Sequence, residues 1–154
     1  MYKNVYLKRG KEESLKRFHP WIFSGAIHHA DEGIEEGEIV RVITADGEFI
    51  AVGHYQIGSI AVRVLSFHDE HIDISFWCAS LESALQMRIA VGIADCPQNN
   101  TYRLVHGEGD NLPGLVIDCY GDTAVMQAHS VGMHVSRMDV CEALVQVMGN
   151  RIKN

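Results

Sequence analysis

The residues near the N-terminus that could do chemistry are cations interleaved with rings. In residues 8–27, KRGKEESLKRFHPWIFSGAI, five basic side chains precede or flank a histidine and the aromatics Trp21 and Phe23. Cations neutralise phosphates, and aromatic or histidine rings stack on splayed bases, so this combination is typical of RNA binding. For Trp21 and Phe23 alone, a place in the core is favoured. The predicted RNA-binding residues are Lys8, Arg9, Lys11, Lys16, Arg17 and His19.

The charge of the chain is unevenly distributed. Residues 1–25 hold six basic and two acidic side chains, a net charge of +4, while the other seven basic and eighteen acidic side chains give −11. A basic stretch on an acidic body indicates a local anion-binding face, with a solvated helix of ordinary lysines as the alternative. The total of −7 argues against a protein that coats nucleic acid with its whole surface.

A second candidate for chemistry is the loop 107–122, GEGDNLPGLVIDCYGD, with four glycines and four carboxylates. Leu112 stands where a dinucleotide-binding fingerprint needs its third glycine, and the spacing of a calcium loop is absent. Glycines at positive φ and the fixed φ of Pro113 are typical of a turn that leads into a strand. The sequence therefore favours a structural turn over the carboxylate site of a metal-dependent hydrolase.

The histidines and cysteines predict neither a metal site nor a nucleophile. His28 and His29 are adjacent, so in a strand they point to opposite faces, and HDEH at 68–71 lacks a zinc-motif spacing. The four cysteines form no C-x-x-C pair and are expected to be reduced and mostly buried. Cys96-Pro97 fits a helix end better than a catalytic site. We therefore assign no catalytic, cofactor-binding or metal-binding residue.

Short strands dominate residues 1–70. The strands are predicted at 3–8, 38–44, 48–55 and 60–66. Asp46-Gly47 favours a hairpin turn between the second and third of these strands. Residues 11–18 predict a short helix, ended by Pro20. The pattern indicates a β-rich barrel or sandwich with one early helix.

Residues 71–154 read as a small α+β domain, with the boundary in the polar stretch 68–75. A helix is predicted at 75–95, strands within 101–129, and a second helix at 133–148. The apolar stripe predicted for the second helix consists of Met138, Cys141, Val145 and Met148. About three short strands are a marginal sheet. We therefore expect this domain to be incomplete, and a homodimer is one way to cover the stripe.

Three segments carry a family resemblance. They are KRGKEESLKRFHPWIFSGAI, GEIVRVITADGEFIAVGHYQIGSIAVRVLSF and YRLVHGEGDNLPGLVIDCYGD, in this order along the chain. They resemble the bacterial large-subunit (23S) ribosomal RNA methyltransferase I family, which transfers a methyl group from S-adenosylmethionine to C5 of cytosine. The motifs H-P-W-x-F-S-G and G-E-x-D-x-L-P-G-L-x-x-D are specific to it. Asn111 departs from a frequent glycine, and asparagine tolerates the same left-handed geometry.

The resemblance implies an α+β chain with a β-rich PUA pseudo-barrel over residues 1–70 and part of a central α+β domain over 71–154. It also implies a missing C-terminal methyltransferase domain that would hold S-adenosylmethionine and the catalytic cysteine, so this chain alone would be inactive. The implied partners are ribosomal RNA and that catalytic domain. We expect a cytoplasmic protein, since no segment is apolar enough for a membrane and no signal peptide is evident. The alternative function is a freestanding protein-interaction module with an acidic surface.

Overall fold

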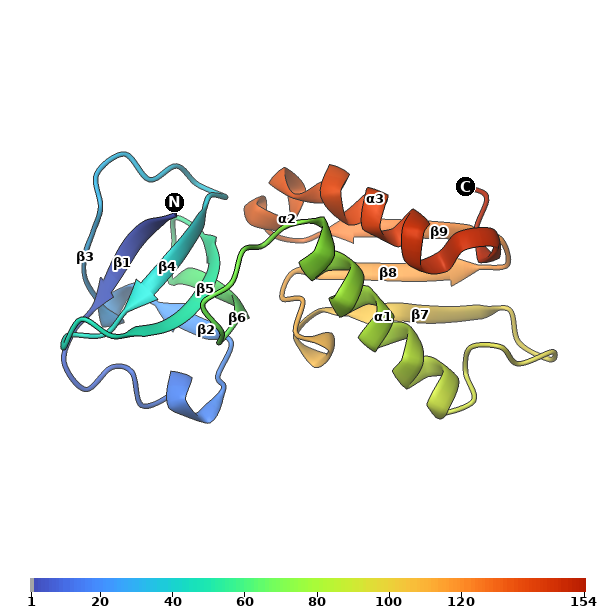
Figure 1. Cartoon of the computed structure of the whole chain (residues 1–154), viewed down its shortest axis with the longest axis horizontal. Helices are drawn as coiled ribbons and strands as arrows, with labels where there is room; N and C mark the ends of the chain where they lie inside the picture. Colours follow the sequence, from blue (N-terminus) through green and yellow to red (C-terminus); the bar gives the residue numbers. More distant parts are fainter. Residues whose placement is uncertain (1) are drawn as a thin grey trace. The chain divides into compact units, whose positions relative to one another are not determined.

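The computed structural model describes residues 2–154 (Figure 1). Contacts between residues divide it into two compact units. The first unit runs to His71 and includes Val131–Val135, and the second unit comprises Ile72–Ser130 and Ser136–Asn154. The mixed α+β class predicted from the sequence is confirmed. The return of residues 131–135 to the first unit has no counterpart in the sequence pattern.

The first unit is built on one curled six-stranded sheet (Figure 1). Its strands are β1 (Lys3–Leu7), β2 (Trp21–Phe23), β3 (Ile27–Ala30), β4 (Ile39–Ile43), β5 (Phe49–Tyr55) and β6 (Ile60–Ser66). Their order across the sheet is β2-β6-β5-β4-β1-β3. The pair β1–β4 is parallel and the other pairs are antiparallel. Both β2 and β3 are therefore edge strands, and the segment that joins β1 to β2 crosses from one side of the sheet to the other.

Period-two alternation selects the core of this unit. Val5 and Leu7 in β1 are buried, whereas Tyr6 between them is only partly buried, because successive side chains of a strand point to opposite faces. The apolar cluster beneath the sheet contains Val5, Leu7, Leu15, Ile22, Val40, Val42, Ala51, Val62 and Val64. Leu15 is the only contribution to this cluster from the segment that joins β1 to β2.

The helix predicted at 11–18 is wrong in type and extent. The structure has a single 3-10 turn, Leu15–Arg17, followed by Phe18 in the left-handed region at φ 60°. Gly10, at φ 77°, turns the chain just before it. One apolar anchor, Leu15, is too little to hold a full helix on the sheet, because an amphipathic helix needs a stripe of buried residues.

The helix predicted at 133–148 is two helices. The first, α2 (Val131–Val135), packs on β5 of the first unit, and the second, α3 (Arg137–Met148), begins after Ser136. A Cβ atom on Gly132 of α2 would lie 2.1 Å from Cγ of His54, so only glycine allows this approach. The break at residue 136 arises because the two helices pack in different units.

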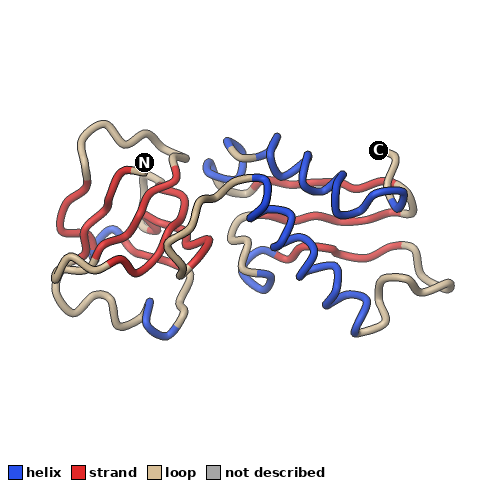
Figure 2. Tube along the Cα trace, in the orientation of Figure 1, coloured by secondary structure: helices blue, strands red, loops and turns tan. Residues whose placement is uncertain are grey.

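The second unit has a three-stranded antiparallel sheet with two helices alongside it (Figure 2). Its elements are α1 (Ile74–Ala90), β7 (Thr101–His106), β8 (Leu115–Tyr120), β9 (Thr123–Ala128) and α3. Asp73 caps α1, since its side chain accepts hydrogen bonds from the backbone N–H of Ser75 (2.9 Å) and Phe76 (3.2 Å). In the central strand β8, Leu115, Ile117 and Cys119 alternate as buried residues, and α1 packs against α3.

The predicted stripe of α3 is wrong for two of its four residues. Met138 and Val145 are 67% and 62% exposed, while Val140 and Leu144 are buried. This helix carries apolar residues on more than one face, so periodicity alone does not select the face that meets α1 and the sheet.

All four cysteines are free thiols. Cys119 is buried and the other three are half-buried. Within residues 2–154, no helix combines the length and the apolar character needed to cross a membrane.

Candidate nucleic-acid interface

The six residues predicted to bind RNA all lie on the connection between β1 and β2. Every one of them is exposed, because this segment runs over the surface and buries little besides Leu15. Lys8 and Arg9 follow β1 directly, and His19 stands two residues before β2. The structure therefore brings the predicted residues into one exposed surface segment, as their closeness in sequence requires.

Ion pairs occupy some of these cations. Nζ of Lys16 lies 2.8 Å from Oε1 of Glu13 and 4.0 Å from Oε1 of Glu12. The hydrogen bond that Lys16 donates to Glu13 raises the pKa of Lys16. The same bond, with the charge of Lys16 and a smaller effect from Arg17, lowers the pKa of Glu13. Glu13 therefore pairs with Lys16, three residues further along the chain. Lys16 thus has two neighbouring carboxylates, whereas Arg9 has one.

Arg9 keeps more freedom. Its Nη2 lies 2.8 Å from Oδ1 of Asp46, and the two side chains are 81% and 65% exposed. Exposed pairs of this kind are weak, so a phosphate can replace the carboxylate. Lys8 donates to the carbonyl oxygen of Gly25 at 2.9 Å, which leaves two of its three donor positions for a ligand.

Rings accompany the cations. His19 lies 5.9 Å from Trp21, and Trp21 lies 6.5 Å from Phe23, measured between ring centroids. In β2 it is Ile22 that is buried, whereas Trp21 is half-buried and Phe23 is 49% exposed. The prediction of a core position is therefore wrong for Phe23, because β2 is an edge strand with its odd residues on the outer face. A cavity of about 330 Å³ is lined by Lys11, Trp21 and Phe23 among others.

Sequence reasoning missed three further rings near Lys8 and Arg9. Tyr6, His28 and His29 line one cavity with these two cations. The alternation of β1, with Val5 and Leu7 inward, was a signal for an outward Tyr6. The neighbouring histidines had no such signal, since their position beside Tyr6 depends on the pairing of β1 with β3.

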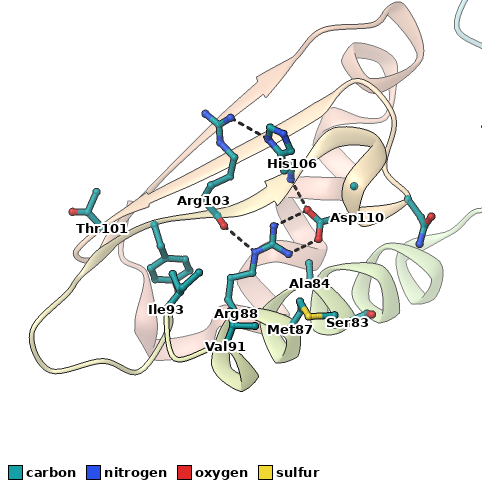
Figure 3. Close-up of a pocket in the computed structure, with 13 residues that line it drawn as sticks. Ser83, Ala84, Met87, Arg88, Val91, Ile93, Thr101, Arg103, His106 and Asp110 are labelled. Carbon is teal, nitrogen blue, oxygen red and sulfur yellow. Dashed lines mark hydrogen bonds and ion pairs between the residues drawn. The ribbon is translucent and has the colours of Figure 1, made fainter.

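A cavity of the second unit contains none of the predicted residues. It has a volume of about 700 Å³ and lies between the C-terminal half of α1, β7 and the acidic loop (Figure 3). Its floor holds an ion pair between Arg88 and Asp110, in which Nη2 lies 2.8 Å from Oδ2. Nε of Arg88 also donates to the carbonyl oxygen of Arg103, and Asp110 accepts the N–H of His106 at 2.6 Å.

These contacts explain the acidic loop. Gly107–Asp110 form a 3-10 turn, and Asn111 follows in the left-handed region at φ 57°. Gly114, at φ 85°, passes so close to Ser130 that a Cβ atom would lie 2.6 Å from its Oγ. Asp110 is bound by Arg88, so the loop is a structural turn, as the sequence favoured. Among residues 2–154, no three metal-binding side chains lie close enough together to hold an ion.

The comparison with protein families decides the nature of the first unit. Residues 5–67 match the model of a PUA-like domain. This stretch is a PUA-like domain. The expectation of a PUA fold in the first part of the chain is thereby confirmed, and the predicted RNA-binding residues lie inside this PUA-like domain.

Curated relatives extend the likeness beyond the PUA-like domain. Over 142 residues, 91% of this chain, it is 37% identical to ribosomal RNA large subunit methyltransferase I of Erwinia tasmaniensis and 38% identical to that of Escherichia coli strain SMS-3-5. The resemblance read from the three sequence segments is confirmed. The chain spans about a third of these relatives, 35% of their length.

Two solved structures share the fold. A candidate SAM-dependent methyltransferase from Streptococcus mutans superposes on 98% of the chain with a TM-score of 0.82 at 18% identity, and the match covers 39% of that protein. The candidate methyltransferase SMU.776, complexed with SAH, gives a TM-score of 0.81 at 18% identity over 38% of its length. At this identity the likeness establishes the fold of both units.

Proposed function

We propose that residues 1–154 form the RNA-binding and substrate-positioning region of an S-adenosylmethionine-dependent ribosomal RNA methyltransferase that modifies C5 of cytosine. The observation that carries the proposal is the exposed cationic segment between β1 and β2 of the PUA-like domain, with rings at both of its ends. The names of the curated relatives support ribosomal RNA as the partner. Such a protein would act in the cytoplasm, where ribosomal RNA is made and folded.

The proposed chemistry divides the work between binding and methyl transfer. The described residues do not fit S-adenosylmethionine well. The sheet β7-β8-β9 is antiparallel and has no crossover from strand through helix to parallel strand, which a dinucleotide-type site uses. Asp110, the carboxylate that lines the cavity of the second unit, already accepts hydrogen bonds from Arg88 and from the N–H of His106. We therefore propose that methyl transfer belongs to the full-length protein and that this region supplies RNA affinity and orientation.

The test is binding of 23S ribosomal RNA fragments across a range of salt concentrations. The region should bind locally and weakly, and affinity should fall steeply with salt because counterions are released from the phosphates. The variant Arg9→Ala/Arg17→Ala should bind less tightly, and the slope of log affinity against log salt should shrink by roughly two phosphate contacts.

Lys153→Ala is the matched control, because Lys153 is exposed and paired with Asp122 at 3.0 Å, in the same manner as Arg9 with Asp46. Equal binding by the double variant and the parent at every salt concentration would remove this surface as the RNA site. Salt-independent capture of a protein, with no RNA binding, would support the interaction-module alternative. Calorimetry should show no micromolar binding of S-adenosylmethionine to the 154-residue chain.

A further inference from the structure

A cavity of about 390 Å³ lies on the PUA-like domain beside the first two predicted phosphate contacts. It is formed where β1 and β3 run side by side, next to the end of β4. The residues that give it its chemistry are Tyr6, Lys8, Arg9, His28, His29 and Thr44. We call it the Tyr6–His29 pocket.

The rings of this pocket are arranged by the register of the sheet. Tyr6 of β1 is paired with His29 of β3, and their rings stack with centroids 4.2 Å apart and planes only 9° apart. The ring of His28 lies 5.1 Å from that of His29 at an angle of 83°. The expectation that these two histidines point to opposite faces is wrong, because the register of β1 with β3 shifts at this position. β3 is an edge strand, so both histidines are exposed. Parallel and perpendicular rings around one cavity suit a flat heterocycle, which gains from stacking and from edge contacts.

The cations of the pocket stand where a phosphate attached to that heterocycle would lie. Lys8 is two residues beyond Tyr6 on the same side of the chain, and Arg9 is held only by the exposed carboxylate of Asp46. Neither cation is buried, so each can move to a phosphate at little cost. Rings for a base and cations for its phosphate thus meet in one cavity, which a patch of scattered surface lysines would not provide.

We propose that the Tyr6–His29 pocket holds one unpaired nucleotide of the bound RNA, with its base against the rings of Tyr6, His28 and His29 and its phosphate at Lys8 and Arg9. This inference rests on the proposed RNA-binding function and specifies its substrate class. A base in a continuous duplex is stacked and paired, so it cannot enter the pocket. The region therefore prefers RNA with a splayed or single-stranded nucleotide over a perfect duplex.

The experiment uses the whole 154-residue chain and a six-nucleotide unstructured RNA with 2-aminopurine at a central position. Stacking in the pocket should change the fluorescence of 2-aminopurine when the parent chain binds. His29→Ala should lose this change and weaken binding roughly tenfold, within the range for one stacked base. His29→Tyr and Tyr6→Phe should retain both, since each keeps a flat ring in place.

His71→Ala is the matched control. His71 is also an exposed histidine beside a tyrosine, with its ring 5.6 Å from that of Tyr2, but the cavity does not include it. Its removal should leave both affinity and fluorescence unchanged. A thermal melt of each variant separates loss of the pocket from loss of the fold, and His29→Tyr tests the stacking even if His29→Ala is destabilised.

The outcomes separate this inference from the proposed function. If the parent binds no RNA at low salt, the proposed function itself fails. The pocket is wrong, while RNA binding stands, if the parent binds with a steep salt dependence but His29→Ala matches it in affinity and fluorescence. Equal affinity for a perfect duplex and for the single strand would also overturn the pocket.

Discussion

The two units each contain an arginine–aspartate pair, and the pairs differ in their surroundings. Arg9 and Asp46 of the first unit are 81% and 65% exposed, with a single contact at 2.8 Å. Arg88 and Asp110 of the second unit are 13% and 8% exposed and form a two-pronged pair (Figure 3). Water screens the first pair and weakens it. The second pair is buried, where either charge alone would be costly because water does not solvate it.

The difference shows how each unit uses its charges. In the second unit, Arg88 and Asp110 also bind the backbone of β7, an edge strand of the sheet. They therefore provide hydrogen-bond partners for backbone groups that an edge strand would otherwise leave unpaired. Arg103 is likewise bound to Asp118 at 2.8 Å. The cations of the first unit near the ring pocket have no such structural duty. We infer that the pair of Arg88 with Asp110 stabilises the second unit, whereas Arg9 of the first unit remains available for a ligand.

The largest expected effect comes from breaking the buried pair. Arg88→Ala leaves Asp110 without its cation and frees the edge of β7, which should lower the free energy of unfolding of the second unit by about 3–5 kcal/mol. Urea unfolding followed through the indole NMR signal of Trp77 measures this effect. The double variant Arg88→Met/Asp110→Leu should recover much of the loss. A single variant as stable as the parent would contradict the structural role of the pair.

Acidification should separate the two units. Burial, with a smaller effect from the charge of Arg63, lowers the pKa of His54 to about 4. Below pH 6.5 the imidazole of His54 is protonated in the unfolded chain, whereas in the folded chain it stays neutral until the pH reaches about 4. The first unit therefore has its full stability above pH 6.5 and loses about 3 kcal/mol as the pH falls to 4.

In the second unit, Asp118 has a lowered pKa because it accepts hydrogen bonds from Arg103, so its contribution is lost only as the pH falls below 3.8. Between pH 6.5 and 4 the first unit should therefore weaken before the second. The indole signals of Trp21 and Trp77 report the two units separately. His54→Gln should flatten the pH dependence of the first unit, and an unchanged dependence would show that His54 is not the group responsible.

A smaller effect on stability is expected from adding a methyl group where α2 packs on β5. Gly132→Ala places a methyl group 2.1 Å from Cγ of His54, so the helix or the ring must move, at a cost of about 1–3 kcal/mol. Amide exchange of residues 131–135 should become faster. Gly25→Ala is the control, since a Cβ atom there meets no heavy atom within 4 Å. Slow exchange of α2 in the variant would mean that the contact is not needed.

The smallest effect is expected at the exposed pair. Arg9→Ala should change the free energy of unfolding by no more than about 0.5 kcal/mol, because the pair is screened by water. Denaturant unfolding of the first unit measures it, beside the Arg88→Ala result for the second. A loss of several kcal/mol would show that Arg9 is structural, which would also weaken its assignment as a phosphate contact.

Local signals accounted for most strands of the first unit. The runs at 38–44, 48–55 and 60–66 agree with β4, β5 and β6 to within a residue at each end, because alternation marks the strands themselves. The turn at Asp46-Gly47 follows its expected conformation, with Gly47 at φ 87°. The prediction of a helix at 11–18 was wrong because it relied on charges that match a helix dipole. The segment has a single buried leucine, which holds only a 3-10 turn on the sheet.

The sequence by itself determined where the cations stand and that they are exposed. Six site residues within a dozen positions are neighbours in any fold, and charged side chains without partners remain in water. It also determined the turn at Gly107–Asp110, since glycine and asparagine are the residues that tolerate the backbone found there.

Only the tertiary structure decided which rings join the cations and which arginine is buried. Tyr6 and His29 are far apart along the chain and meet through the register of β1 with β3, and Arg88 meets Asp110 because α1 lies beside β7. Both contacts depend on pairing between distant segments. Such pairing is set by the free energy of the whole core, and a local sequence pattern does not determine it.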